Sequence, residues 1–384
     1  MRIGYITKQN PLNRKAYSGT HYYMYKALEN SFEEVIPLGP VDSKYKIIPK
    51  IKGRLLRLLS GKVYKYQYDV RLAKRMASIV DQKITDSNPD VLLASLMNPE
   101  MAYLKSNLPL YLTADATFTL LNEVYGSHSN LHPLSIKEAK HLEQKAFEKA
   151  IKLILPLNWL ADSAMKDYGV PSKKIEVIPY GPNLDTNITE SELNDIVENR
   201  QHSSKVKLLF VGIRWEEKGG PFAVEVLRAL TKKGVGAELY IVGCEPEIAD
   251  KPEEIKVVGF VDKEKEEGRK QLHQLYKDAT FFIMPTKAEC VGMSFIEAAS
   301  YGLPSIGSET GGVPEAVVDG ETGFICRSSQ SPEEVADWII AVHKNEDRYK
   351  KISLQAYSRY KNHMNWENWG KRVLEVIGNE LDPH

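Results

Sequence analysis

The stretch "LLFVGIRWEEKGGPFAVEVL", residues 208–227, has the pattern of a buried strand, a polar loop and a helix. The apolar run ends at Gly212, and Pro221 suits the first turn of a helix. Arg214 and Lys218 therefore fall in a loop between the carboxyl end of a parallel strand and a helix N-terminus. Backbone N–H groups and the helix dipole favour anions there, and two cations add charge-assisted hydrogen bonds. We expect a phosphate-binding loop, with two solvated surface cations as the alternative.

Similar runs of Val, Ile, Leu and Phe recur between helical patterns along the 384 residues. Such alternation is typical of parallel sheets covered by helices on both faces. One series of strand patterns precedes residue 181 and a second follows residue 205, so the sequence predicts two Rossmann-like doubly wound α/β domains. Segment 181–205 is polar and lacks a strand pattern, and we interpret it as the hinge region.

Composition and charge set limits on the class of protein. Lys plus Arg and Asp plus Glu each total 51, so the formal net charge is zero and by itself says nothing about a polyanionic partner, although the distribution of charge can. No apolar run reaches the roughly eighteen residues of a membrane span, and the N-terminal one is too short for a signal peptide. Three widely separated cysteines argue against a disulfide framework or zinc site and fit a reducing cytosol. We expect a cytoplasmic protein.

Two glutamates, with seven residues between them, lie in "KAECVGMSFIEAASYG", residues 287–302. Glu289 falls in the loop after a strand, and Glu297 lies about a turn and a half into the following helix. Carboxylates at this offset can accept hydrogen bonds from two vicinal hydroxyl pairs, one on a sugar and one on a ribose. A general acid–base pair and an exposed acidic helix face are the alternatives. The backbone N–H groups that would face the ligand of Glu289 belong to Val291, Gly292, Met293 and Ser294.

A third loop on the same edge of the second sheet contains "GGVPE", residues 311–315. Together with Arg214 and Lys218 after "FVG" and with the pair Glu289 and Glu297, it resembles the donor domain of GT-B fold glycosyltransferases. The similarity is specifically to the large retaining family 4, the glycosyl transferases group 1. It extends over nearly the whole chain, because "IPYGPNLD" at 178–185 resembles the interdomain segment and "VVGFV" at 257–261 the nucleotide-base strand.

The resemblance implies an enzyme with two Rossmann-like domains that face a cleft. Residues 1–180 would bind the acceptor, residues 181–361 the nucleotide sugar, and a helix in 362–384, containing Trp366 and Trp369, would cross back to the first domain. The implied reaction moves a hexose from a UDP-, GDP- or ADP-sugar to a hydroxyl of a glycan, lipid or small molecule, with retention. No cofactor metal is expected, since two cations and a helix N-terminus already face the diphosphate.

The resemblance also implies roles for single residues. Arg214 and Lys218 would stabilise the diphosphate leaving group, Glu289 would hold the sugar hydroxyls, and Glu297 would bind the ribose. Backbone groups near Gly212 and at or beside Val261 would meet the nucleotide. In the first domain, Gly19 would lie against the diphosphate. Asp115, which ends a strand, would lie near the sugar and acceptor, with capping of the next helix as the alternative.

Residues 43–75 form a basic segment with seven lysines, four arginines and a single acid, Asp69. Leucines and tyrosines give it interfacial character, so it could lie on an anionic membrane surface or receive an anionic acceptor. A solvated basic helix pair is the alternative. Nucleic acid is the least favoured partner, because no recognised binding module accompanies the segment.

Two other functions remain open at this point. The same fold serves sugar-nucleotide epimerases and phosphorylases, which would need acid–base groups around the sugar or a second phosphate site. A non-catalytic sugar-nucleotide-binding protein belongs to a different class and would not need all four of Arg214, Lys218, Glu289 and Glu297.

Overall fold

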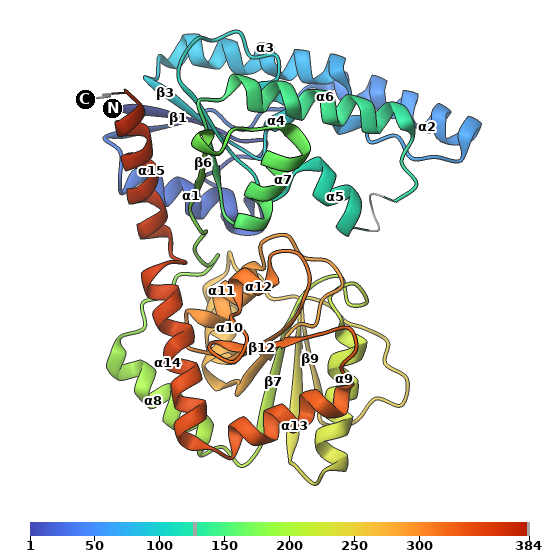
Figure 1. Cartoon of the computed structure of the whole chain (residues 1–384), viewed down its shortest axis with the longest axis vertical. Helices are drawn as coiled ribbons and strands as arrows, with labels where there is room; N and C mark the ends of the chain where they lie inside the picture. The colour runs from blue at the N-terminus through green and yellow to red at the C-terminus, as the bar shows by residue number, and fades with distance from the viewer. Residues whose placement is uncertain (126–128, 382–384) are drawn as a thin grey trace. The chain divides into compact units, whose positions relative to one another are not determined.

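The computed structural model describes residues 1–125 and 129–381, which form two compact units (Figure 1). The first unit combines Met1–Pro179 with the C-terminal segment Trp366–His384, and the second comprises Tyr180–Asn365. Each unit contains one parallel sheet of six strands, so the prediction of two doubly wound α/β domains is confirmed.

The sheet of the first unit has the strand order β2-β1-β3-β4-β5-β6, with every neighbouring pair parallel. Its strands are β1 (Arg2–Ile6), β2 (Glu34–Pro37), β3 (Val91–Ser95), β4 (Leu110–Thr113), β5 (Lys152–Leu155) and β6 (Ile175–Val177). The helices of this unit are α1 (Thr20–Glu29), α2 (Ile47–Ser60), α3 (Val70–Ser87), α4 (Asn98–Met101), α5 (Phe118–Val124), α6 (Pro133–Lys149), α7 (Asn158–Tyr168) and α15 (Trp366–Leu381). The strand order reverses between β1 and β3, where doubly wound folds bind ligands.

Helix α15 returns the end of the chain to the first unit and packs against α1 (Figure 1). Its buried face carries Trp369, Val373 and Ile377, spaced as one stripe of a helix. The contact is closest at Gly370, where an added Cβ would lie 2.5 Å from the carbonyl oxygen of Ala27. A glycine is therefore required where the two helices touch.

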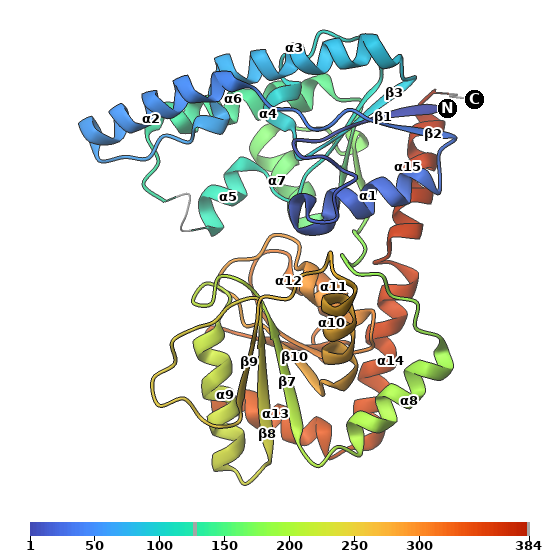
Figure 2. The same ribbon diagram turned by 180° about the vertical axis from the view of Figure 1, so that it is seen from behind.

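The sheet of the second unit has the order β12-β11-β10-β7-β8-β9, again entirely parallel. Its strands are β7 (Val206–Val211), β8 (Ala237–Val242), β9 (Ile255–Gly259), β10 (Phe281–Ile283), β11 (Ser305–Ser308) and β12 (Gly323–Cys326). Its helices are α8 (Glu190–Gln201), α9 (Gly220–Lys232), α10 (Glu266–Asp278), α11 (Met293–Ala299), α12 (Val313–Ala316), α13 (Pro332–His343) and α14 (Glu346–Asn362). The reversal point lies between β7 and β10 (Figure 2).

The interpretation of segment 181–205 as a hinge is wrong for its second half. Helix α8 occupies residues 190–201 and buries Leu193 and Val197 in the core of the second unit. Its Arg200 is also buried and donates hydrogen bonds to the backbone carbonyls of Tyr276, Lys277 and Gly302 at 2.8–3.1 Å. Arg200 counts as a polar residue in the composition of the segment, but its guanidinium lies in the core and hydrogen-bonds buried carbonyls. Composition does not reveal such a role.

We predict opposite effects for two alanine substitutions in α15. Gly370→Ala should lower the free energy of unfolding of the first unit by about 1–3 kcal/mol, because the new methyl group would collide with the backbone of α1. Gly378→Ala is the matched control: a Cβ there meets nothing within 4 Å, and alanine should stabilise the helix by up to about 1 kcal/mol. Urea unfolding, with hydrogen exchange of α15, measures both. Equal effects of the two changes would contradict the packing described here.

Candidate functional site

The loop from β7 to α9 is the centre of the candidate site in the second unit. It places Arg214 and Lys218 beyond the carboxyl end of β7, and Pro221 lies in the first turn of α9, as predicted. Gly219 has φ +79°, and a Cβ on it would lie 2.0 Å from the carbonyl oxygen of Pro285. The loop after β7 can thus touch the loop after β10 backbone to backbone only because residue 219 is glycine.

Lys218 and Glu289 form an ion pair across these two loops. The Lys218 Nζ lies 2.8 Å from Glu289 Oε2 and also donates to the carbonyl of Ala288 at 3.0 Å. Both side chains are largely buried, with 12% and 15% of their surface exposed. The second Glu289 oxygen, Oε1, accepts the N–H of Cys290 at 3.0 Å. A carboxylate has about four lone-pair directions, so Glu289 retains acceptor capacity for hydroxyl groups.

Thr286 connects the same two loops through a second set of hydrogen bonds. Its hydroxyl contacts the carbonyls of Glu217 at 3.2 Å and Ala288 at 2.8 Å, and the N–H of Lys287 donates to Glu217 at 2.8 Å. The Ser308 hydroxyl, at the end of β11, donates to the carbonyl of Thr286. Three neighbouring strand ends are therefore held as one rigid edge.

Arg214 lies at the outer side of this edge. Its Nη1 is 3.0 Å from Glu217 Oε1, and half of its side chain, 51%, is exposed. A guanidinium carries several N–H donors in a planar fork, a geometry suited to phosphate oxygens.

Glu297 lies deeper than Glu289 and already has two partners. Its Oε1 is 2.9 Å from the Lys263 Nζ, and its Oε2 accepts the Tyr276 hydroxyl at 2.9 Å. Burial, beside this carboxylate, raises the pKa of Tyr276 well above its ordinary value, so the phenol acts as a donor. The carboxylate is almost fully buried, which rules out the alternative of an exposed acidic helix face.

The start of α11 presents backbone groups close to Glu289. Gly292 caps the helix with φ +79°, Val291 is buried, and Met293 and Ser294 are half-buried. The Ser294 hydroxyl lies 3.5 Å from the carbonyl of Val211, the last residue of β7. This segment is therefore packed against the β7 edge, as the predicted site requires.

The ends of β7 and β9 add an apolar border to the same edge. Val261 packs into the core, so only its backbone faces outward, whereas Phe260 exposes 70% of its surface. Ile213, directly after Gly212, is similarly exposed. At Gly212 a Cβ would lie 3.3 Å from Lys218 Cγ, so the glycine makes room for that lysine.

In the first unit, Gly19 and Asp115 lie at the carboxyl edge of the sheet. Tyr17, Ser18 and Gly19 have successive φ values of 51°, 56° and 105°, which bring the chain from β1 into α1. The Tyr17 hydroxyl donates to Asp115 Oδ2 at 2.6 Å. Asp115 does not cap the following helix, because Thr117 is the N-cap of α5 and accepts the N–H of Leu120. The capping alternative for Asp115 is therefore excluded.

Two buried acids lie near this edge. Glu100, on α4, is 3.9 Å from the Lys8 Nζ, and burial raises its pKa to about 7. Glu143, on α6, accepts the N–H of Phe118 at 2.7 Å, and burial raises its pKa to about 6. Neither acid was identified from the sequence, because an isolated glutamate in a helical pattern reads as a surface residue.

The structure brings Arg214, Lys218, Glu289 and Glu297 to one edge of the second sheet, and Gly19 and Asp115 to one edge of the first. Lys263, Tyr276 and Thr286 were missed. Lys263 and Thr286 had a sequence signal, because each lies in a loop after a strand, whereas Tyr276 had none. Within residues 1–125 and 129–381, no group of three His, Cys, Asp or Glu side chains could hold a metal ion.

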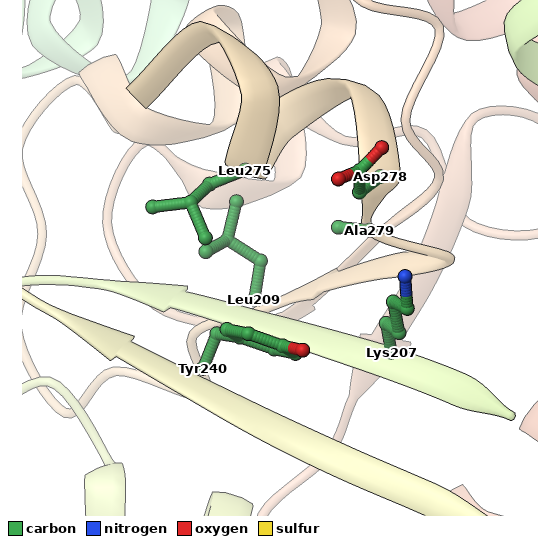
Figure 3. A pocket seen from close by; sticks show the side chains of 6 residues that line it. All are labelled: Lys207, Leu209, Tyr240, Leu275, Asp278 and Ala279. Carbon is green, nitrogen blue, oxygen red and sulfur yellow. The ribbon is translucent and has the colours of Figure 1, made fainter. Parts of the chain in front are cut away.

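A small hollow of about 40 Å³ in the second unit is separate from this site (Figure 3). It is lined by Lys207, Leu209, Tyr240, Leu275, Asp278 and Ala279. Lys207 is near the start of β7 and Asp278 ends α10, so the hollow lies toward the amino end of the sheet. It contains none of the predicted site residues.

We predict that Glu100 makes the stability of the first unit depend on pH. Between pH 4.5 and about 7 the folded carboxyl keeps a proton that the unfolded chain releases, so the free energy of unfolding falls as pH rises. Relative to Glu100→Gln, the wild type should lose up to about 3 kcal/mol across this window. Glu375→Gln, an exposed position on α15, is the control. Denaturant unfolding at several pH values measures the difference, and a constant difference would contradict the prediction.

Known proteins resemble this chain in sequence and in structure. The sequence model of the family Glycosyl transferases group 1 matches residues 205–345. Among curated relatives, the amylovoran biosynthesis glycosyltransferase AmsK of Erwinia amylovora is 24% identical over 241 residues, 59% of this chain and 56% of its own. The lipopolysaccharide 1,2-N-acetylglucosaminetransferase of Salmonella typhimurium is 25% identical over 243 residues, 60% of this chain and 63% of its own. The matched regions span about half the length of such relatives.

Solved structures agree over the whole chain. The sucrose-phosphate synthase of Thermosynechococcus elongatus has a TM-score of 0.69 at 15% identity and covers 100% of both chains. Anabaena Alr3699/HepE, in complex with UDP and glucose, has a TM-score of 0.65 at 14% identity, covering 98% of this chain and 99% of its own. At these identities the likeness establishes the fold. Residues 205–345 therefore match the family Glycosyl transferases group 1, and the chain has the two-domain GT-B fold of these solved structures.

Proposed function

We propose that the protein transfers a hexose from a nucleoside-diphosphate sugar to a hydroxyl of a glycan, lipid or small-molecule acceptor, with retention at the anomeric carbon. The observation that carries this proposal is the buried Lys218–Glu289 pair at the switch point of the second sheet. The pair places a cation, which suits the diphosphate, next to a carboxylate, which can accept hydrogen bonds from the sugar hydroxyls.

Lys218 and Arg214 would act on the leaving group. Breaking the bond between the anomeric carbon and the diphosphate leaves negative charge on phosphate oxygen, and preorganised cations stabilise that charge without reorganising. Lys218 is preorganised by Glu289 and by the Ala288 carbonyl. The acceptor oxygen then bonds to the anomeric carbon, and its proton passes to the leaving phosphate. No protein nucleophile is assigned.

Glu289 would accept hydrogen bonds from sugar hydroxyls while it holds Lys218. Glu297 would accept the ribose hydroxyls with its remaining lone pairs, oriented by Tyr276 and Lys263. Phe260 offers an exposed ring to the base beside the backbone of Val261. UDP, GDP and ADP all remain candidates; that Anabaena Alr3699/HepE was solved with UDP supports testing UDP first.

We assign acceptor binding to the first unit, where Asp115 lies at the sheet edge. We also propose that the reaction needs no metal, since Arg214, Lys218 and the N-terminus of α9 supply positive charge to the diphosphate.

The alternatives make different demands on the site. An epimerase requires titratable groups around the sugar, and a phosphorylase a second phosphate site. A binding protein without catalysis would also hold the anionic diphosphate with cations, so slow hydrolysis of the donor without acceptor is the result that distinguishes an enzyme from it.

We predict that Lys218→Ala lowers kcat by at least about 100-fold, because the charge on the departing diphosphate loses its nearest cation. The melting temperature should change far less, since Glu289 keeps its hydrogen bond from Cys290. Lys232→Ala, at the opposite end of α9 and exposed, is the control. Release of nucleoside diphosphate in the presence of EDTA measures turnover. Normal transfer by Lys218→Ala would refute the site assignment.

We predict that one of UDP, GDP and ADP, or its sugar conjugate, raises the melting temperature without added metal, because it binds only the native state. The shift should disappear in Arg214→Ala and persist in Arg228→Ala, a surface arginine that bonds Glu225. A shift of the same size in Arg214→Ala would exclude this residue from the diphosphate site.

A further inference from the structure

Helix α2 exposes an unusually apolar face at the outer end of the first unit (Figures 1 and 2). In both views the helix extends past α6. Of the large apolar side chains that are exposed in residues 1–125 and 129–381, six lie on this helix of 14 residues: Ile47, Ile48, Ile51, Leu55, Leu58 and Leu59. Leu58 and Leu59 expose 82% and 85% of their surface. At 100° per residue these six positions fall within one arc of about 120°. We refer to them as the outer face of α2.

Hydrogen bonds and ion pairs bind the opposite side of α2 to the rest of the first unit. The outer face is therefore exposed in a helix whose orientation is fixed. Lys52 donates to the Tyr64 hydroxyl at 2.8 Å and to Asp69 Oδ2 at 3.0 Å, and it pairs with Glu138 Oε1 at 3.4 Å. Tyr64 in turn donates to Asp69 and Glu138. This buried polar cluster joins α2 to α3 and α6 and fixes which side of the helix faces outward.

Cations border the outer face on one side. Lys50, Arg54 and Arg57 are exposed and occupy the adjacent arc of the helix. Within the described residues, none of the three pairs with an acid, and residues 43–68 contain no Asp or Glu. A symmetric contact between the outer faces of two copies would therefore bring like charges together with no carboxylate from this segment to compensate them. An anionic surface with an apolar interior satisfies both the cations and the leucines.

We propose that the outer face of α2 docks the protein on a membrane that contains anionic lipids, with the leucines inserted at the level of the acyl chains and the cations among the headgroups. No helix in residues 1–125 and 129–381 is long and apolar enough to cross a membrane, so attachment would be by this surface helix. The inference does not depend on the proposed transfer reaction.

Vesicle flotation of the full-length protein tests this proposal. We expect binding to an equal mixture of phosphatidylcholine and phosphatidylglycerol, little binding to phosphatidylcholine alone, and release at high salt. Leu58→Ser/Leu59→Ser should weaken binding by about tenfold or more. Arg54→Gln/Arg57→Gln should weaken it by about fivefold for each charge removed. Circular dichroism and melting temperature should stay unchanged, because all four side chains are exposed.

Matched controls lie elsewhere on the surface. Leu354→Ser removes an exposed leucine from α14, and Lys166→Gln/Lys173→Gln removes two exposed cations from the first unit; both should leave binding unchanged. Absence of flotation with either lipid, or equal binding by the leucine and control variants, would overturn the proposal. Self-association that is lost in Leu58→Ser/Leu59→Ser, without flotation, would also overturn it and assign the outer face to a second copy.

Discussion

The contact between Gly219 and Pro285 determines how the candidate site of this protein is built. Because residue 219 has no side chain, the loop after β7 lies directly on the loop after β10, at the point where the strand order of the second sheet reverses. Lys218 and Glu289 then fall within hydrogen-bond distance, although 70 residues separate them in the chain. The hydrogen bonds of Thr286 and Lys287 to Glu217 also hold these two loops together.

A buried ion pair of this kind is costly unless each charge is well satisfied. Here the carbonyl of Ala288 gives Lys218 a second acceptor, and the N–H of Cys290 gives Glu289 a second donor. Glu297 is satisfied differently, by an ammonium and a phenol. The two glutamates, with seven residues between them, thus differ in depth and in partners, which supports the proposal that they serve two parts of one ligand.

The first unit contains buried acids and exposed leucines, two features that are unusual in a folded domain. Its edge contains Glu100 and Glu143, whose pKa values burial raises to about 7 and about 6. Its outer helix α2 exposes leucines that a folded domain would ordinarily bury. Both features depart from the pattern that favours stability, buried acids in one case and exposed leucines in the other, and such departures often mark functional sites.

Local sequence patterns were enough to predict the two sheets, the loop that contains Arg214 and Lys218, and the position of Glu289 and Glu297, because strand periodicity and the carboxyl-edge rule depend on neighbouring residues. Local pattern did not predict the role of a residue whose interaction partner is distant in the chain. Arg200 looked like part of a polar hinge, although it saturates carbonyls some 76 to 102 residues away. The partner of Asp115 is Tyr17, the partners of Glu297 are Lys263 and Tyr276, and the orientation of α2 follows from Lys52 and its acids. Only the tertiary structure decided these, because long-range contacts fix which side chains are buried and what each one must satisfy.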